Sequence, residues 1–411
     1  VKVAHLLERL QQTIDRLKLL TNIQIETSRT RLTVNLMNAM IYAAVEQYST
    51  SHLRKSSIRM LARSITENKS HHGEHYITRN RSEYFKMFYS AAGGGVIIAL
   101  MALNKIHIAS LGFGEFTTSF LAGLNYGLGF MLIHMLHCTV ATKQPAMTAA
   151  SFAEQVDSNE GSKAVDNKLA KLLIDVCRSQ SVAVFGNVSI AILLAAGIAW
   201  GYAYTHGQPL LNEAVTAYQL KSIEIFTQPT LWYAAIAGVW LFCSGIIAGF
   251  FDNRSDYLNL RQRLPFNPLL RKIMRPEPRR RLAAYIHKHY GSLMGNFIFG
   301  MLLGMTGYFG HLFGLPLDIR HVAFSSANLG YAAISDHVDI FTFMLGLASV
   351  LAIGMVNLVV SFSLALAVAL RSRGTRLGSM RNLLKSFWSQ VKANPLILLY
   401  PVQVNNKENT K

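Results

Sequence analysis

Six long apolar stretches constrain this chain more than any other feature of its sequence. A helix needs about 20 consecutive apolar residues to cross the ~30 Å hydrocarbon core of a bilayer. Hydrophobic residues make up 51% of this chain and charged residues only 15%. The apolar stretches lie at about residues 84–102, 117–137, 182–204, 229–251, 291–315 and 341–370. We therefore predict an all-α polytopic membrane protein with about six transmembrane helices and an N-terminal amphipathic helical region.

The basic residues collect in alternate segments between these stretches. Of the 40 Lys and Arg residues, 37 lie in the segments 1–86, 138–181, 252–290 and 371–411. The other 3 lie in the segments 104–116, 205–228 and 318–340. Cytoplasmic loops of membrane proteins carry an excess of Lys and Arg. We therefore expect a multi-pass protein with both termini in the cytoplasm.

The formal net charge of +18 restricts the partners of the chain. Anionic lipid headgroups explain a basic face beside a bilayer, at about 1 kcal/mol for each Lys or Arg near the surface. We expect the phospholipid bilayer as a partner, with anionic lipids at the cytoplasmic face. A nucleic-acid surface is the alternative, but no aromatic RNA-binding pattern, zinc finger or basic zipper accompanies the charge. A homo-oligomer or a membrane partner stays an open alternative.

Three regions follow from the pattern: a cytoplasmic helical region at 1–83, a six-span bundle at 84–370 and a basic cytoplasmic tail at 371–411. In the first region, apolar residues recur at the three- and four-residue spacing of an amphipathic helix, at Leu6, Leu7, Leu10, Ile14 and Leu17. A cytoplasmic helical bundle fits this pattern, and a helix on the inner leaflet or paired with a partner is the alternative. The chain begins at Val1, so we expect a processed product or the later part of a longer protein.

Pairs of glycines four residues apart recur in the predicted spans. They are Gly123 and Gly127, Gly197 and Gly201, Gly245 and Gly249, Gly291 and Gly295, and Gly300 and Gly304. Small residues at this spacing let two helices approach closely in a membrane. We expect a compact bundle, with a glycine-lined substrate path as the alternative.

Polar residues at membrane depth mark a first candidate site. Asn125, His134 and His137 lie in the second span, and Lys143 and Gln144 follow it. Two His residues one turn apart could bind a metal or pass a proton, but a complete site needs a third ligand, such as His311. We expect hydrogen bonds between helices or at the interface instead, with neither a metal nor a cofactor.

A second candidate site lies in the predicted outer loop between the last two spans. Asp318, Arg320 and His321 could support acid–base chemistry or bind a cation. We expect them to be solvated loop residues. The chain contains no phosphate-binding loop, zinc-protease motif, serine-hydrolase motif or dinucleotide fingerprint, and this lowers the expectation of an enzyme.

Four further segments, taken together, carry a resemblance to a known family. They are Arg-Asn-Arg-Ser-Glu-Tyr at 79–84, Gly-Leu-Asn-Tyr-Gly at 123–127, Ala-Thr-Lys-Gln-Pro-Ala-Met-Thr-Ala at 141–149 and Leu-Asp-Ile-Arg-His-Val at 317–322. With these segments the chain resembles a bacterial family of polytopic membrane proteins named site-specific recombinases. The resemblance implies a location in the bacterial inner (cytoplasmic) membrane and a helical region before Val1. The family name implies DNA strand exchange.

The residues that strand exchange requires are not legible in this sequence. A tyrosine recombinase needs Arg, His-x-x-Arg and a Tyr nucleophile at one phosphate. Arg279, Arg280 and Arg281 near Tyr290 come closest, but the required arginine after His287 is missing. We therefore expect a non-enzymatic role in lipid or solute transport or in envelope assembly. A membrane-tethered DNA site-specific recombinase is the alternative.

Overall fold

A computed structural model describes residues 29–48, 80–140, 163–373 and 380–401, together with Thr78 and several positions between 10 and 21. The chain forms two compact units, Val1–Ser64 and Ile65–Lys411. Lys143 and Gln144 of the first candidate site lie outside the described residues.

The first unit contains the helix α2 (Arg29–Tyr48). A helical region was predicted for residues 1–83, and α2 is a helix within it. Several apolar side chains of α2 are exposed, namely Val34, Met37, Met40, Ile41 and Val45. Leu10, Ile14 and Leu17, which the amphipathic pattern singled out, are also helical and exposed.

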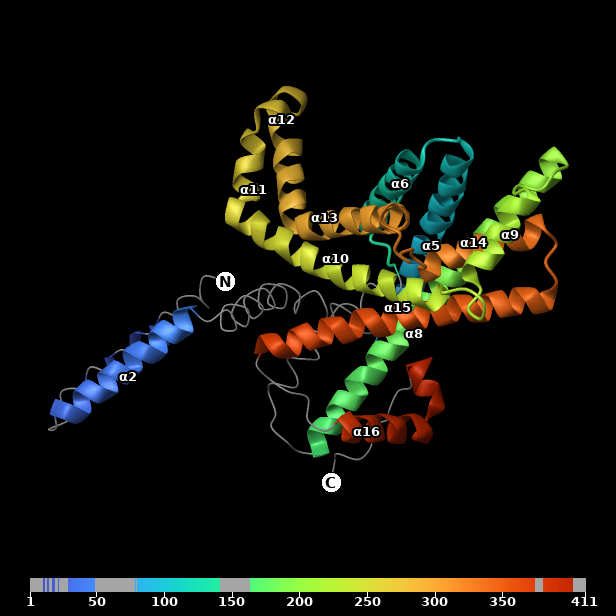
Figure 1. The fold of residues 1–411 in the computed structure, drawn as a ribbon. Helices are drawn as coiled ribbons and strands as arrows, with labels where there is room; N and C mark the ends of the chain where they lie inside the picture. Colours follow the sequence, from blue (N-terminus) through green and yellow to red (C-terminus); the bar gives the residue numbers. More distant parts are fainter. Residues whose placement is uncertain are drawn as a thin grey trace. The chain divides into compact units, whose positions relative to one another are not determined.

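Among its described residues, the second unit contains six helices that are long and apolar enough to cross a membrane (Figure 1). They are α5 (Arg81–Ser110), α6 (Glu115–Met135), α8 (Lys163–His206), α10 (Thr230–Leu258), α13 (Pro276–Phe313) and α15 (Ile340–Arg373). The described residues contain no strand. The chain is thus an all-α polytopic membrane protein, and the prediction of six spans is confirmed.

Short helices connect or flank the six long ones. They are α9 (Glu213–Ile223), α11 (Leu260–Arg263), α12 (Pro268–Ile273), α14 (Val322–Ser335) and α16 (Met380–Ala393), with the 3-10 turns η2 (Leu264–Phe266) and η3 (Pro395–Leu398). Hydropathy alone did not separate α9 and α14 from loops, because helices of 11 and 14 residues are too short to span a bilayer.

The core of the second unit lies where α5, α6, α8, α13 and α14 meet. Phe130 of α6, Phe299 of α13 and Tyr331 of α14 are almost fully buried there. The Phe130 and Phe299 rings are 5.1 Å apart between centroids. The Tyr331 hydroxyl donates a hydrogen bond to the carbonyl of Ala99 on α5 (3.1 Å). These contacts fix α14 against helices far from it in sequence.

The C-terminal segment packs against the N-terminal part of α8. Leu383 of α16 is buried in one cluster with Leu169 of α8. Arg178, also on α8, donates hydrogen bonds to the carbonyl oxygen of Ile397 (3.4 Å) and to the carboxylate of Asp175 (2.7 Å). The segment predicted as a tail is therefore attached to the bundle through its described residues.

The glycine pairs of α6 and α13 pack against each other. A Cβ atom on Gly300 would overlap the backbone of Gly127, and one on Gly304 would overlap the backbone of Gly123. This confirms close packing for these pairs. Gly197 and Gly201 of α8 differ, because a Cβ atom there would meet nothing within 4 Å.

We predict opposite effects of alanine at Gly300 and at Gly197. Alanine is about 1 kcal/mol more favourable than glycine inside a helix. Gly197→Ala should therefore leave the melting temperature unchanged or raise it. Gly300→Ala should lower it, because overpacking costs about 1–3 kcal/mol. Thermal unfolding of both variants in detergent measures this difference, and a neutral Gly300→Ala would contradict the packing of α6 on α13.

Candidate functional site

The segment between α13 and α15 folds back into the bundle. Residues 315–320 have no regular structure, and α14 follows them with ten of its 14 residues buried. A Cβ atom on Gly330 of α14 would lie 2.6 Å from the carbonyl oxygen of Ile192, in the apolar part of α8. The expectation of a solvated loop is wrong for this segment, which we call the re-entrant segment (residues 315–335).

A second interruption lies beside the re-entrant segment, between α9 and α10. The chain leaves α9 at Ile223 and enters α10 at Thr230. The Thr230 hydroxyl donates hydrogen bonds to the carbonyl oxygens of Glu224 and Ser222. These bonds supply partners for carbonyl groups that the end of α9 leaves without helical partners. The carbonyl of Ser222 also accepts a bond from the re-entrant segment.

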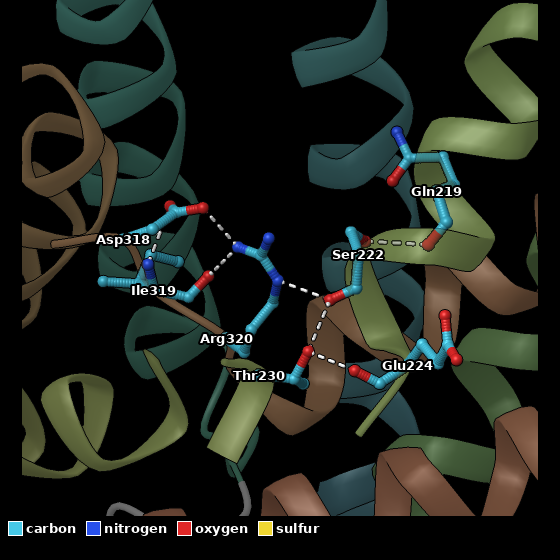
Figure 2. Close-up of polar contacts among 7 residues, drawn as sticks. All are labelled: Gln219, Ser222, Glu224, Thr230, Asp318, Ile319 and Arg320. Atoms are coloured by element: carbon cyan, nitrogen blue, oxygen red, sulfur yellow. Dashed lines mark hydrogen bonds and ion pairs between the residues drawn. The ribbon is translucent and has the colours of Figure 1, made fainter. Parts of the chain in front are cut away.

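Arg320 joins the two interruptions (Figure 2). Its Nε donates to the Ser222 carbonyl (2.6 Å), and its Nη1 donates to the Asp318 carboxylate (2.6 Å). Its Cζ lies 5.3 Å from the ring centroid of Tyr233 on α10. The Arg320 side chain is 16% exposed and that of Asp318 is 36% exposed. In Figure 2, Nη2 makes no bond to any of the residues drawn.

Lys105 of α5 completes the charged group. It lies close enough to Asp318 and Arg320 to interact electrostatically with both, and Tyr126 of α6 does the same. Two positive charges and one negative charge leave this group with a net charge of +1. Lys105 was not among the residues predicted for a site, because it lies in the last two turns of α5, beyond the apolar stretch. Its signal was a charge inside a membrane helix, which is costly and often functional.

Asn357 of α15 holds the backbone of the re-entrant segment. Its side-chain amide donates to the carbonyl oxygens of Ala234 (2.7 Å) and Arg320 (3.0 Å). Its oxygen accepts a bond from the backbone amide of Val322 (3.1 Å). Asn357 is fully buried. One side chain thus connects α15, α10 and the start of α14.

His321 lies apart from the charged group, in an aromatic box. The ring centroids of Phe130, Phe299 and Phe324 are 6.4, 6.0 and 5.9 Å from that of His321. Burial lowers the pKa of His321 to about 4, because desolvation disfavours the charged imidazolium. His321 is therefore neutral near pH 7 and packs as part of the core.

The first candidate site does not assemble around its predicted residues. His134 pairs with His289 of α13 (Nε2 to Nδ1, 3.1 Å), whereas His137 is exposed with a φ of 55°. Asn125 donates to the carbonyl of Met101 (2.8 Å), a bond between α6 and α5. His311 pairs with Glu115 (2.6 Å), where α13 ends and α6 begins.

Within the described ranges, no group of three or more His, Cys, Asp and Glu residues could hold a metal ion. His134 and Asn125 join helices, which is the interhelical role expected for them. The pairing with His289 could not be found from sequence, because the two residues are far apart in the chain.

A Ser-His-Asp grouping on α10 and α13 is not arranged for nucleophilic catalysis. His287 Nδ1 lies 2.9 Å from the Ser255 hydroxyl, and its Nε2 lies 3.6 Å from the Asp256 carboxylate. Ser255 is only 1% exposed, and its hydroxyl also contacts the His287 carbonyl (3.1 Å). A nucleophile must reach its substrate. These contacts therefore act as a connection between the two helices.

Tyr290 and the three arginines before it do not converge. All lie on α13, with Tyr290 nine residues after Arg281. That spacing corresponds to about 14 Å along a helix axis. The Tyr290 ring packs edge-on against Phe251 of α10, with 5.3 Å between centroids. This arrangement does not present a tyrosine and arginines to one phosphate.

We predict that Asn357→Leu destabilises the protein. Leucine removes two donated bonds and one accepted bond, and an unsatisfied buried polar group costs about 1–3 kcal/mol. Asn104→Leu is the matched control, because Asn104 is exposed and donates one bond, to Asn125 (3.0 Å). Thermal unfolding should show a clearly larger decrease for Asn357→Leu, and equal decreases would contradict the role assigned to Asn357.

The comparisons with known proteins identify one family. The family model described as site-specific recombinase matches residues 1–401. No curated protein and no solved structure matches the chain at a significant level. The match extends over both the first unit and the six-helix unit. The chain therefore belongs to the site-specific recombinase family.

Proposed function

We propose that the chain is a non-enzymatic transport protein of the bacterial inner membrane that moves a small anionic solute. One observation carries the proposal. The re-entrant segment brings Asp318 and Arg320 to Lys105 inside a bundle of membrane-spanning helices. The residues of the proposed site come from α5 (Lys105), from α9 (Ser222) and from the re-entrant segment (Asp318 and Arg320).

Interrupted backbone inside a membrane bundle supports a transport role. Non-helical backbone occurs at membrane depth only where it is buried in protein or lines a water-filled cavity. Transporters use broken helices of this kind to build substrate sites. Here the interruption before α10 and the re-entrant segment share the carbonyl of Ser222.

The charges of the site favour an anion. The two positive formal charges of Lys105 and Arg320 and the one negative charge of Asp318 leave one positive charge unbalanced. Arg320 uses Nε and Nη1 for protein contacts, which leaves Nη2 for another acceptor. Guanidinium groups bind carboxylate and phosphate oxygens well, because their planar donors match the geometry of these groups. A carboxylate or phosphate solute would complete the charge balance of the site.

The family name supports the alternative of a membrane-tethered recombinase, but the geometry does not favour it. Strand exchange needs a nucleophile and cationic groups at one phosphate. Tyr290 contacts Phe251 and lies about 14 Å along α13 from Arg281. Transport of a lipid and a role in envelope assembly are the other non-enzymatic functions, and neither predicts uptake of a small anion.

We predict anion uptake by proteoliposomes that contain the full chain. Radiolabelled inorganic phosphate and succinate are the probes, and glycerol is the uncharged control. Arg320→Gln and Lys105→Gln should each lower anion uptake about tenfold or more, because a hydrogen bond to a charged group contributes about 1.5–3 kcal/mol. The exposed Arg254 provides the matched control Arg254→Gln, which should transport normally.

Arg320 also holds backbone in place, so Lys105→Gln is the sharper variant. Lys105 makes no hydrogen bond to the described residues, and its loss should leave the melting temperature nearly unchanged. Uptake no greater than that of protein-free vesicles for both anions would contradict the proposal. Uptake that both site variants leave intact would show that the path lies elsewhere in the bundle.

The proposed orientation gives a separate prediction. Alkaline phosphatase fused after Gly112, Gly207 or His337 should be active, because these turns should face the periplasm. Fusions after Leu270 or Tyr400 should be inactive, because the basic segments should face the cytoplasm. The reverse pattern would place the Arg320 site on the cytoplasmic side.

A further inference from the structure

The hairpin between α10 and α13 is strongly basic. Residues 259–284, which we call the basic arm, contain α11, η2, α12 and the first turns of α13. This stretch contains eight Lys and Arg residues and a single acidic residue, Glu277. Such a charge imbalance predicts an anionic partner. The transport site does not use it.

The basic arm runs across the direction of α10 (Figure 1). The bend in α13 has a local cause, because the backbone amide of Gly291 donates a hydrogen bond to the Asp252 carboxylate on α10 (2.9 Å). A side chain that inserts into the helical hydrogen-bond pattern bends a helix. Since α10 crosses the membrane, an arm that turns across its axis extends along the membrane surface.

Large apolar side chains of the arm are exposed beside its charges. Phe266 is 70% exposed, Leu269 is 68% exposed and Ile273 is 78% exposed. Leu269 and Ile273 lie four residues apart on α12, so they share one face. Exposed aliphatic and aromatic side chains together with Lys and Arg are typical of segments that bind a membrane interface. The exposed aliphatic pair fits a membrane interface and is not a feature by which proteins bind nucleic acid.

A pocket of about 610 Å³ lies within the arm. It is lined by Arg261, Gln262, Pro265, Phe266, Arg280 and Ala284. Arg261 comes from α11 and Arg280 from α13, so two guanidinium groups reach one pocket from different helices. Arg280 contacts Glu277 (3.3 Å), but both side chains are 71% exposed. Exposed ion pairs are weak, so a phosphate can replace Glu277 as the partner of Arg280.

We propose that this pocket binds the phosphate of an anionic phospholipid at the membrane surface. Arg261 and Arg280 contact the phosphate oxygens, which guanidinium groups can bind in pairs. Phe266, Leu269 and Ile273 enter the interface beside the bound lipid. The binding anchors the hairpin of α10 and α13 to one leaflet. This site is independent of the transport site at Arg320.

The test is lipid titration of the full chain in a non-ionic detergent, followed by native mass spectrometry. Phosphatidylglycerol should bind, and phosphatidylcholine should bind much more weakly. The double variant Arg261→Gln with Arg280→Gln should bind phosphatidylglycerol about 30-fold more weakly, from the usual contribution of two arginines near an anionic surface. Leu269→Ser with Ile273→Ser should weaken the attachment of both lipids.

The matched control removes the same charge elsewhere. Arg381 and Lys385 of α16 are exposed, and Arg381→Gln with Lys385→Gln should leave phosphatidylglycerol binding within a few-fold of the parent chain. All four changed basic side chains are exposed, so melting temperatures without lipid should stay equal.

Three results would overturn the proposal. An equal loss of phosphatidylglycerol binding in the Arg261/Arg280 variant and in the Arg381/Lys385 variant would mean that total charge, and not the pocket, attracts the lipid. Competition by millimolar inorganic phosphate at the strength of the lipid would mean a site for free phosphate. A short DNA duplex that binds through Arg261 and Arg280, while lipid binding is unaffected, would mean a nucleic-acid surface.

Discussion

The buried side-chain amide of Asn357 provides hydrogen-bond partners for backbone groups where the chain leaves the helical pattern. Inside a bilayer there is no water to bond an exposed carbonyl or amide group, so any interruption of a helix needs partners from the protein. Asn357 supplies them to Ala234, Arg320 and Val322. With these bonds in place, Arg320 can be held at the turn into α14. The charged site therefore depends on a residue that carries no charge.

Glycine packing positions the surroundings of that turn. The backbones of α6 and α13 approach closely at Gly127 and Gly300. This closeness brings the Phe130 and Phe299 rings to 5.1 Å from each other, and both rings lie beside His321. A neutral imidazole fits an aromatic box, because its burial disfavours the charged form. The start of α14 is held both by these rings, through His321, and by Asn357, through the backbone amide of Val322.

Positive charge has two different roles in the functions proposed for this protein. At Arg320 and Lys105, a small excess of charge is held inside the bundle and partly balanced by Asp318. In the basic arm, charge lies on exposed side chains beside apolar ones. The first arrangement suits one small anion, and the second suits a lipid surface. Neither of these two arrangements brings a tyrosine nucleophile and arginines to one phosphate.

Composition and residue spacing predicted the six spans, the helical class and close packing at glycine pairs, because these features depend on local hydropathy and spacing. Which helices the glycine pairs join came from the structure. They also singled out Asp318, Arg320 and His321, but placed them in a solvated loop. The helix α14 is as apolar as the spans, but its 14 residues are too few to cross a bilayer. Only its packing against α8 therefore reveals that it is buried.

Other features depended wholly on the tertiary structure. The pairing of His134 with His289 and the approach of Lys105 to Asp318 join residues from different helices. The crosswise arm depends on the contact between Gly291 and Asp252. Sequence alone determined which segments enter the membrane, because transfer into lipid depends on each segment's own side chains. The tertiary structure decided which polar groups meet there, because each of them needs a partner that another helix supplies.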